Sequence, residues 1–192
     1  MALKKAVFLD KDGTLVVDVP CNVDPKKIVL VSNAVAALRL LSELGYKLLV
    51  ITNQSGIARG YFSEQELILY LHELDTLFRE SNIILDGFYY CPHDKSADCD
   101  CRKPKPGMVQ KAAHELGIDL AASWFIGNTL NDAEAGYRAG CRTILIDGGN
   151  ETLEEFNRDS SSLLQSAERL PHYIVPDLYS ASHIINSKSN SL

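Results

Sequence analysis

The sequence has no apolar run that approaches the ~20 residues needed to cross a bilayer. It also lacks an excess of positive charge, because 19 Lys and Arg face 25 Asp and Glu and the net charge is −6. That charge argues against nucleic-acid binding through bulk electrostatics. The amino terminus does not look like a signal peptide, because Asp10 and Asp12 directly follow a short apolar run. We therefore expect a soluble, cytoplasmic protein that binds neither nucleic acid nor a membrane.

The chain shows no internal repeat and no low-complexity linker that would divide it. Its 192 residues, 46% of them hydrophobic, suffice for one domain with a real core. We expect residues 1–192 to form that single domain. Five cysteines without an export signal are expected to bind metal or catalyse rather than to pair. Cys21 and Cys141 have no obvious partners, and we expect Cys141 to be a small buried residue.

Apolar runs of strand length alternate with amphipathic stretches. We expect strands at residues 5–9, 47–52, 87–90, 123–126 and 142–146, and an edge strand at 173–175. The expected helices run from a Ser32 cap to Gly45, from a Ser63–Glu66 capping box to Arg79, from Pro106 to Gly117, and over about residues 132–139. Residues 151–170 are expected to be irregularly helical, and residues 180–192 to fray. This alternation predicts an α/β fold with a mostly parallel sheet and helices on both faces.

Polar residues follow three of the expected strands, and ligands bind beyond the carboxyl ends of such strands. The three pairs are Asp10 with Asp12, Thr52 with Asn53, and Asn128 with Asp132. Two carboxylates before a glycine suit Mg²⁺, or a division of labour between a nucleophile and an acid/base, although an Asp-Gly turn has the same composition. Asp132 has two interpretations, as a charge partner of the following helix or as a residue that orients a metal site.

Two further segments carry groups that bind anions. Residues 52–56 offer a hydroxyl, amides and backbone N–H groups beside a glycine, which together can cradle a phosphate. Arg102 and Lys103 are adjacent cations held by a proline, and both suit a phosphate. A polar loop and a solvated surface are the alternatives for these two segments.

Three cysteines and a histidine lie within eleven residues, namely Cys91, His93, Cys99 and Cys101. Their number and kinds match a Cys₃His tetrahedral zinc site, with incidental thiols as the alternative. The residues between them are polar and cannot form a core of their own. A metal would therefore hold the loop at residues 91–101 closed and set the direction of Arg102 and Lys103.

These motifs resemble those of the haloacid dehalogenase superfamily of phosphohydrolases, over about the first 150 residues. DxDGT after the first strand, a Thr after the second, a later Lys and an acidic pair form the site in that pattern. Within it, TNQSGIARGYFSE from Thr52 and CPH…CDCRKPKPGM from Cys91 look like the D-glycero-D-manno-heptose 1,7-bisphosphate phosphatase family. The histidinol-phosphate phosphatases share the zinc loop and come second. The resemblance implies a three-layer Rossmann-like fold with no large cap domain, a zinc-bound loop and a monomer.

The resemblance also implies a mechanism and its residues. Asp10 would form an aspartyl-phosphate, Asp12 would act as acid and then base, and Thr52 and Lys103 would stabilise the phosphoryl oxygens. Mg²⁺ would be held by Asp10, the carbonyl of Asp12, and Asn128. The partner would be a small phosphorylated sugar that loses its 7-phosphate. Its contacts would be Asp18, Asn53, Gln54, Ser55, Arg102 and Thr129, with Arg59 as a further candidate for its anion.

Two residues depart from the family pattern. Asn128 stands where the family usually has Asp, so one negative charge is lost and Mg²⁺ binding should weaken. Thr129 stands where the family usually has Lys or Arg, so a contact to the substrate phosphate is lost. Two alternatives therefore remain: a phosphatase of histidinol phosphate or another small phosphomonoester, and a non-catalytic protein that binds phosphorylated sugars.

Overall fold

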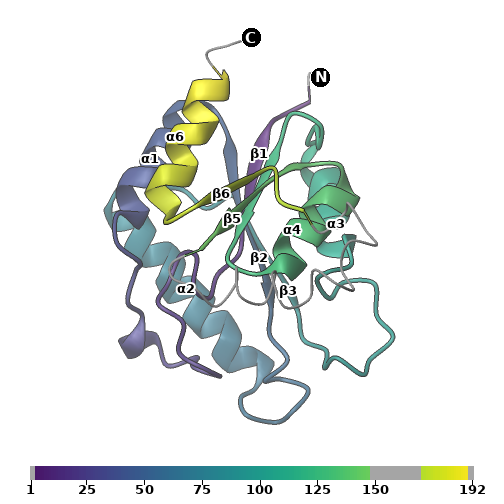
Figure 1. The fold of residues 1–192 in the computed structure, drawn as a ribbon. Helices are drawn as coiled ribbons and strands as arrows, with labels where there is room; N and C mark the ends of the chain where they lie inside the picture. Colours follow the sequence, from purple (N-terminus) through teal and green to yellow (C-terminus); the bar gives the residue numbers. More distant parts are fainter. Residues whose placement is uncertain (1–2, 148–169, 190–192) are drawn as a thin grey trace.

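The computed structural model describes residues 3–147 and 170–189, which are arranged around one six-stranded sheet (Figure 1). The strands are β1 (Ala6–Leu9), β2 (Lys47–Asn53), β3 (Gly87–Cys91), β4 (Trp124–Gly127), β5 (Arg142–Ile146) and β6 (Tyr173–Val175). All neighbouring strands are parallel, in the order β3-β2-β1-β4-β5-β6. The predicted parallel α/β sheet is confirmed, and β6 lies at its edge as expected.

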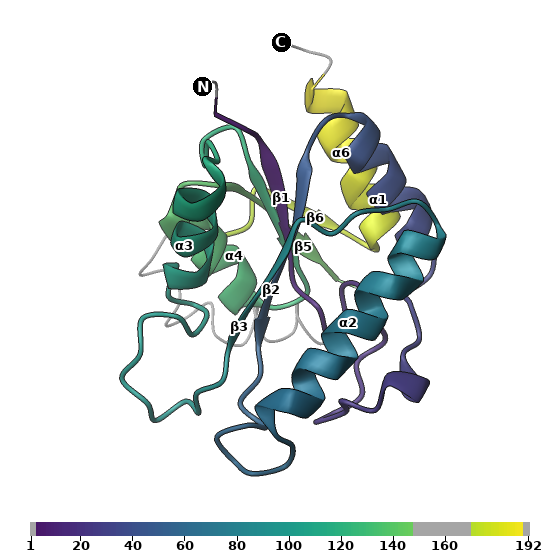
Figure 2. The ribbon, with the colours of Figure 1, turned by 180° about the vertical axis from the view of Figure 1, so that it is seen from behind.

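Helices cover both faces of the sheet and make three layers (Figure 2). One face carries α1 (Ala34–Glu43), α2 (Glu64–Glu80) and α6 (Leu178–Ser189), and the other carries α3 (Gly107–Leu116) and α4 (Leu130–Ala139). Alternate β1 side chains pack into the cores on opposite faces of the sheet, because successive side chains of a strand point in opposite directions. Val7 packs in the core under α1, whereas Phe8 packs in the core under α3. None of the described helices is long and apolar enough to cross a membrane.

The strand order reverses at the adjacent carboxyl ends of β1 and β4. From β1 the chain moves to β2 and β3 on one side, and then returns to β4 on the other. Such a reversal leaves room for a ligand between the two adjacent strand ends. The Ser63–Glu66 capping box forms as expected at the start of α2, with the Ser63 hydroxyl 3.2 Å from the backbone nitrogen of Glu66.

The helices differ from the expectations at the start of α1 and in α6. Ser32 does not cap α1, because Asn33 occupies the cap position in a left-handed conformation, with φ of 60° and no side-chain cap hydrogen bond. The prediction that residues 180–192 fray is wrong as far as Ser189, because α6 buries Ala181 and Ile185 in the core that it shares with α1. Residues 190–192 and the helix expected at 151–170, apart from Leu170, lie outside the described residues.

Candidate active site

Asp10 lies at the end of β1, where the chain turns sharply. Its backbone nitrogen donates to the carbonyl oxygen of Ile126 in β4 at 2.9 Å, which ties the two strand ends together. Gly13 has φ of 77°, and a Cβ there would lie 2.1 Å from the outward-facing end of the Asn128 carboxamide. Glycine is therefore required for the turn and for the close approach of Asn128.

Lys103 comes from the loop before α3 and is only 4% exposed. Its Nζ lies 2.6 Å from Oδ1 of Asp10 and 2.7 Å from Oδ1 of Asp132, and it donates to the carbonyl oxygen of Ile51 at 2.9 Å. Burial lowers the pKa of Lys103, but the two carboxylates outweigh it and hold the pKa above its ordinary value. The ammonium therefore stays charged.

Asp10 has a strongly perturbed pKa. Burial and then the neighbouring charge of Asp132 raise its pKa to about 7, although Lys103 acts in the opposite direction. Two carboxylates thus share a single ammonium in a buried site. This excess of negative charge favours an additional cation.

Asn53, which was expected to contact substrate, is bound on both sides to the backbone of Lys103. Its Nδ2 donates to the carbonyl oxygen of Lys103 at 3.2 Å, and its Oδ1 accepts from the backbone nitrogen of Lys103 at 3.1 Å. The side chain therefore holds the Lys103 backbone beside the end of β2.

Asp12 is held through both of its carboxylate oxygens. Lys11 Nζ lies 2.5 Å from Oδ1, and Gln54 Nε2 donates to Oδ2 at 3.0 Å and to the hydroxyl of Thr52 at 2.9 Å. Lys11 is 1% exposed and its Nζ lies 4.5 Å from the ring centre of Tyr70. Sequence reasoning missed Lys11, and its position between two aspartates was the only signal.

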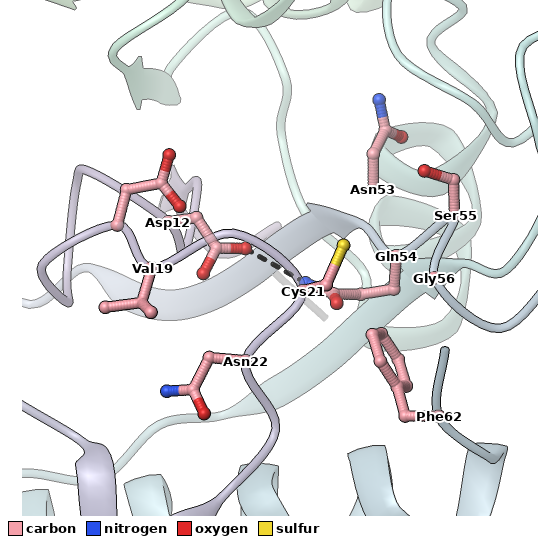
Figure 3. Close-up of a pocket in the computed structure, with 10 residues that line it drawn as sticks. Asp12, Val19, Cys21, Asn22, Asn53, Gln54, Ser55, Gly56 and Phe62 are labelled. Carbon is pink, nitrogen blue, oxygen red and sulfur yellow. Dashed lines mark hydrogen bonds between the residues drawn. The ribbon is translucent and has the colours of Figure 1, made fainter. Parts of the chain in front are cut away.

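A cavity of about 110 Å³ opens beside Asp12 (Figure 3). It brings together four residues that the sequence assigned to the substrate, namely Asp18, Asn53, Gln54 and Ser55. Burial, followed by the charge of Asp12, raises the pKa of Asp18. The remaining lining residues are Val19, Cys21, Asn22, Gly56 and Phe62.

Arg102 lies at a second cavity, of about 520 Å³, which Lys103 also lines. Lys95, Lys105 and Arg138 add further positive charge to it, and Glu134 adds one negative charge, 2.6 Å from Nη2 of Arg138. Arg59 lines neither cavity, and its Nε pairs with Oδ2 of Asp94 at 2.6 Å.

Thr129 is brought to the site, where it supports Asp132. Its hydroxyl donates to Oδ2 of Asp132 at 2.7 Å, as part of a capping box at the start of α4. Asp132 thus caps its helix with one oxygen and pairs with Lys103 through the other. The first interpretation of Asp132, as a partner of the following helix, is confirmed, and the second, as a residue that orients a metal site, stays a prediction.

The carboxamide of Asn128 faces the two oxygens that were expected to hold Mg²⁺. The inward-facing atom lies 3.3 Å from Oδ2 of Asp10 and 3.1 Å from the carbonyl oxygen of Asp12. As a nitrogen that atom donates to both oxygens, and as an oxygen it completes a cluster of three oxygens. Oxygen ligands are those that Mg²⁺ prefers. The donor set fits this ion.

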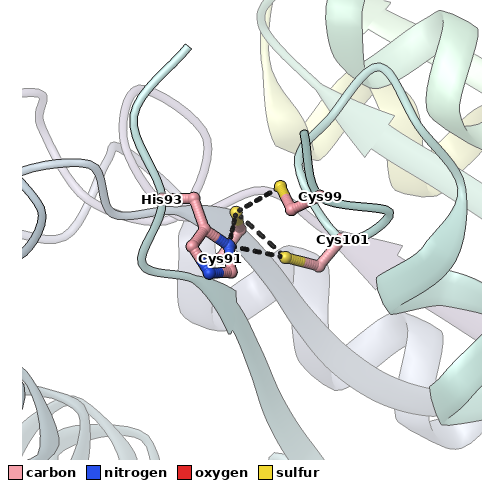
Figure 4. A group of neighbouring side chains, drawn as sticks. All are labelled: Cys91, His93, Cys99 and Cys101. Atoms are coloured by element: carbon pink, nitrogen blue, oxygen red, sulfur yellow. Dashed lines mark hydrogen bonds between the residues drawn. The ribbon is translucent and has the colours of Figure 1, made fainter. Parts of the chain in front are cut away.

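The Cys/His cluster comes together in the loop after β3 (Figure 4). Its four potential ligand atoms, from Cys91, His93, Cys99 and Cys101, all lie within 4.8 Å of one another. The Sγ atoms of Cys91 and Cys99 are 3.8 Å apart, close to the ~3.8 Å between ligands of a tetrahedral zinc with ~2.3 Å bonds. The residues thus fit a zinc ion.

This loop is anchored to the groups around the candidate site. The backbone nitrogen of Gln54 donates to the carbonyl oxygen of Cys91 at 2.7 Å. Arg102 donates from Nη1 to the carbonyl oxygen of His93 at 2.9 Å. The pair between Arg59 and Asp94 ties the loop to the segment after β2.

Comparison with known proteins matches the chain to two related family models. The model described as haloacid dehalogenase-like hydrolase matches residues 21–140, and one described as HAD-hydrolase-like matches residues 100–181. The chain is 39% identical over 179 residues to a D-glycero-beta-D-manno-heptose-1,7-bisphosphate 7-phosphatase of Pasteurella multocida, a match that covers 90% of this chain and 97% of that protein. The relative of the same name from Escherichia coli K12 is 37% identical over 177 residues, with 88% and 93% covered.

A solved structure shows the same fold at similar coverage. It is a D,D-heptose 1,7-bisphosphate phosphatase from B. bronchiseptica in complex with magnesium and phosphate. It superposes with a TM-score of 0.80 and 28% identity, and the match covers 96% of this chain and 99% of that one.

Proposed function

The chain belongs to the haloacid dehalogenase-like hydrolases, and from this premise we propose that it removes the 7-phosphate of D-glycero-D-manno-heptose 1,7-bisphosphate in a magnesium-dependent reaction. The buried Asp10–Lys103–Asp132 cluster carries the proposal. It sets a candidate nucleophile beside a charged ammonium and beside the oxygens of Asp12 and Asn128. The names of relatives that are 37–40% identical over nearly their whole lengths support the substrate.

In the proposed reaction, a carboxylate oxygen of Asp10 attacks phosphorus and the bond to the sugar oxygen breaks. Asp12 in its protonated form gives a proton to that departing oxygen, and the carboxylate so formed takes a proton from the water that attacks the aspartyl-phosphate. Lys103 and the Thr52 hydroxyl stabilise charge on the phosphoryl oxygens. Mg²⁺, held by Asp10, the Asp12 carbonyl and Asn128, would offset the repulsion between a carboxylate and an anionic phosphate.

Two cavities adjoin this site, and we assign a different part of the substrate to each of them. The cavity beside Asp12 offers the polar groups of Asp18, Gln54 and Ser55 to sugar hydroxyls. The retained phosphate would meet Arg102 in the cationic cavity. This local positive charge is needed because the whole chain is acidic, with a net charge of −6.

We also propose that the Cys₃His cluster holds a structural zinc. The four ligand atoms leave no open position for a substrate on a tetrahedral ion. We further propose that the protein is a monomer in the cytoplasm. It would act on a carbohydrate and would not bind nucleic acid. The absence of any disulfide among the five cysteines, all of them in the described residues, suits a reducing compartment.

The decisive experiment measures phosphate release from heptose 1,7-bisphosphate and from histidinol phosphate with and without Mg²⁺. We expect release from the bisphosphate only, only with Mg²⁺, and none from the Asp10→Asn variant. Asp24→Asn is the matched control, because Asp24 caps a short 3-10 helix (Pro25–Lys27) and lines neither cavity. Phosphate release from histidinol phosphate alone would show that the enzyme acts on that compound and not on the bisphosphate. Binding of the bisphosphate without any phosphate release would favour the non-catalytic alternative.

A further inference from the structure

Asn128 can present either end of its carboxamide to the same two oxygens. With its nitrogen inward, it donates to Oδ2 of Asp10 at 3.3 Å and to the carbonyl oxygen of Asp12 at 3.1 Å. With its oxygen inward, three oxygens converge, and they repel one another unless a cation lies between them. An aspartate at this position would offer oxygens in every orientation.

We infer that Asn128 alternates between two roles, donating through its nitrogen to Asp10 and Asp12 while magnesium is absent and turning its oxygen inward when the ion binds. The inference rests on the proposed function, because it takes these three residues as the magnesium ligands. The turn needs rotation only about the terminal side-chain bond, whose torsional preference is broad and roughly two-fold. Gly13 leaves the space beside the carboxamide that any larger residue would fill.

The surrounding charges explain why an amide suits this position without the ion. Asp10 and Asp132 are buried and share the single ammonium of Lys103. A third carboxylate at position 128 would add repulsion, whereas the amide nitrogen supplies two hydrogen bonds. The same amide carries no negative charge to attract the ion. Asn128 therefore stabilises the magnesium-free site and weakens the affinity for magnesium.

The first test compares the wild type with Asn128→Asp in thermal unfolding and in calorimetric titration with MgCl₂. The buffer is freed of magnesium with a resin instead of a chelator, so that zinc stays in the Cys/His loop. We expect Asn128→Asp to lower the melting temperature without magnesium and to bind magnesium about tenfold more tightly. Asn33→Asp is the matched control, because it adds the same charge at an exposed residue that makes no side-chain cap hydrogen bond and lines neither cavity. It should change neither quantity substantially. A melting temperature for Asn128→Asp that is unchanged or higher without magnesium would overturn the inference.

The second test follows the side-chain NH₂ of Asn128 by NMR in protein labelled with ¹⁵N-asparagine. The signal is assigned by its disappearance in Asn128→Asp. We expect magnesium to shift this signal and to speed its exchange with solvent, because the nitrogen leaves its two acceptors. Magnesium binding with an unaltered NH₂ signal refutes the inference and leaves the proposed function intact. Failure of the wild type to bind magnesium at all contradicts the proposed function itself, and the inference with it.

Discussion

Asn53 is a polar residue beside a cavity whose side chain is hydrogen-bonded to the backbone of another residue. Both ends of its amide are engaged by the backbone of Lys103. The Nζ of Lys103 must stay within reach of both Asp10 and Asp132, so a small shift of its backbone would break two close ion pairs. Asn53 is thus a positioning residue for the candidate catalytic lysine.

We predict that Asn53→Ala lowers kcat for phosphate release on the order of 10²-fold with little change in KM, because a small misplacement of a reacting group is costly. Ser55→Ala should instead raise KM, because Ser55 lines the cavity that we assign to the sugar. Steady-state kinetics separate the two outcomes. A raised KM with an unchanged kcat in Asn53→Ala would show that Asn53 binds substrate directly.

Lys11 and Gln54 hold the proposed acid/base, Asp12, from two sides. The fully buried ammonium of Lys11 contacts one oxygen, and the amide of Gln54 links the other oxygen to Thr52. A buried ammonium is costly unless it is paired. The ion pair with Asp12 therefore stabilises Lys11 and also orients Asp12.

At the scale of elements, the Cys/His loop connects β3 to the segment that carries Arg102 and Lys103. Its polar residues bury little surface, so its shape depends on its own ligand atoms and on contacts such as the pair between Arg59 and Asp94. A metal that fixes the loop would also fix the start of the segment that ends in Lys103. Zinc in this loop would therefore support the catalytic site without contacting the substrate.

We predict about one zinc per chain by elemental analysis, and its loss in Cys99→Ser. The variant should keep the sheet, because Cys99 is only partly buried at the edge of the core under α3. Its kcat should fall because Lys103 loses its fixed position. Cys21→Ser is the control for the zinc content, because Cys21 lies outside the cluster. A zinc-free wild type with full activity would refute the role of the metal.

At the scale of the whole molecule, α6 completes one face of the sheet. It packs against α1, and Ile185 has no exposed surface. Burial of an apolar side chain of this size contributes roughly 1.5–3 kcal/mol. The helix near the end of the chain is therefore part of the core, even though its sequence is rich in serine.

We predict that Ile185→Ala lowers the free energy of unfolding by about 2–5 kcal/mol, as for other large-to-small changes in a core. Ile174→Ala should cost much less, because Ile174 is 45% exposed. Urea denaturation of the two variants measures the difference. Equal losses would mean that α6 does not form part of the cooperative core.

The sequence by itself determined the parallel α/β fold, the candidate residues Asp10, Asp12, Thr52 and Lys103, and the composition of the Cys/His cluster. These features are local: a strand shows in a short apolar run, a capping box in four residues, and a metal cluster in eleven. The predicted start of α1 was wrong because two neighbouring residues both suit the cap position of a helix. Ser32 and Asn33 both suit a helix start, and only the backbone conformation at Asn33 decides between them.

Tertiary structure alone decided what the polar residues do for one another and whether the end of the chain is helical. Asn53 meets Lys103 across 50 residues, Gln54 meets Asp12 across 42, and α6 meets α1 across more than 130. No pattern within a short window reports such contacts, because they depend on how the sheet brings its strand ends together. The fold brings the ends of the strands to one edge of the sheet, where Asn53 meets the backbone of Lys103. It also packs α6 against α1, which buries one face of α6.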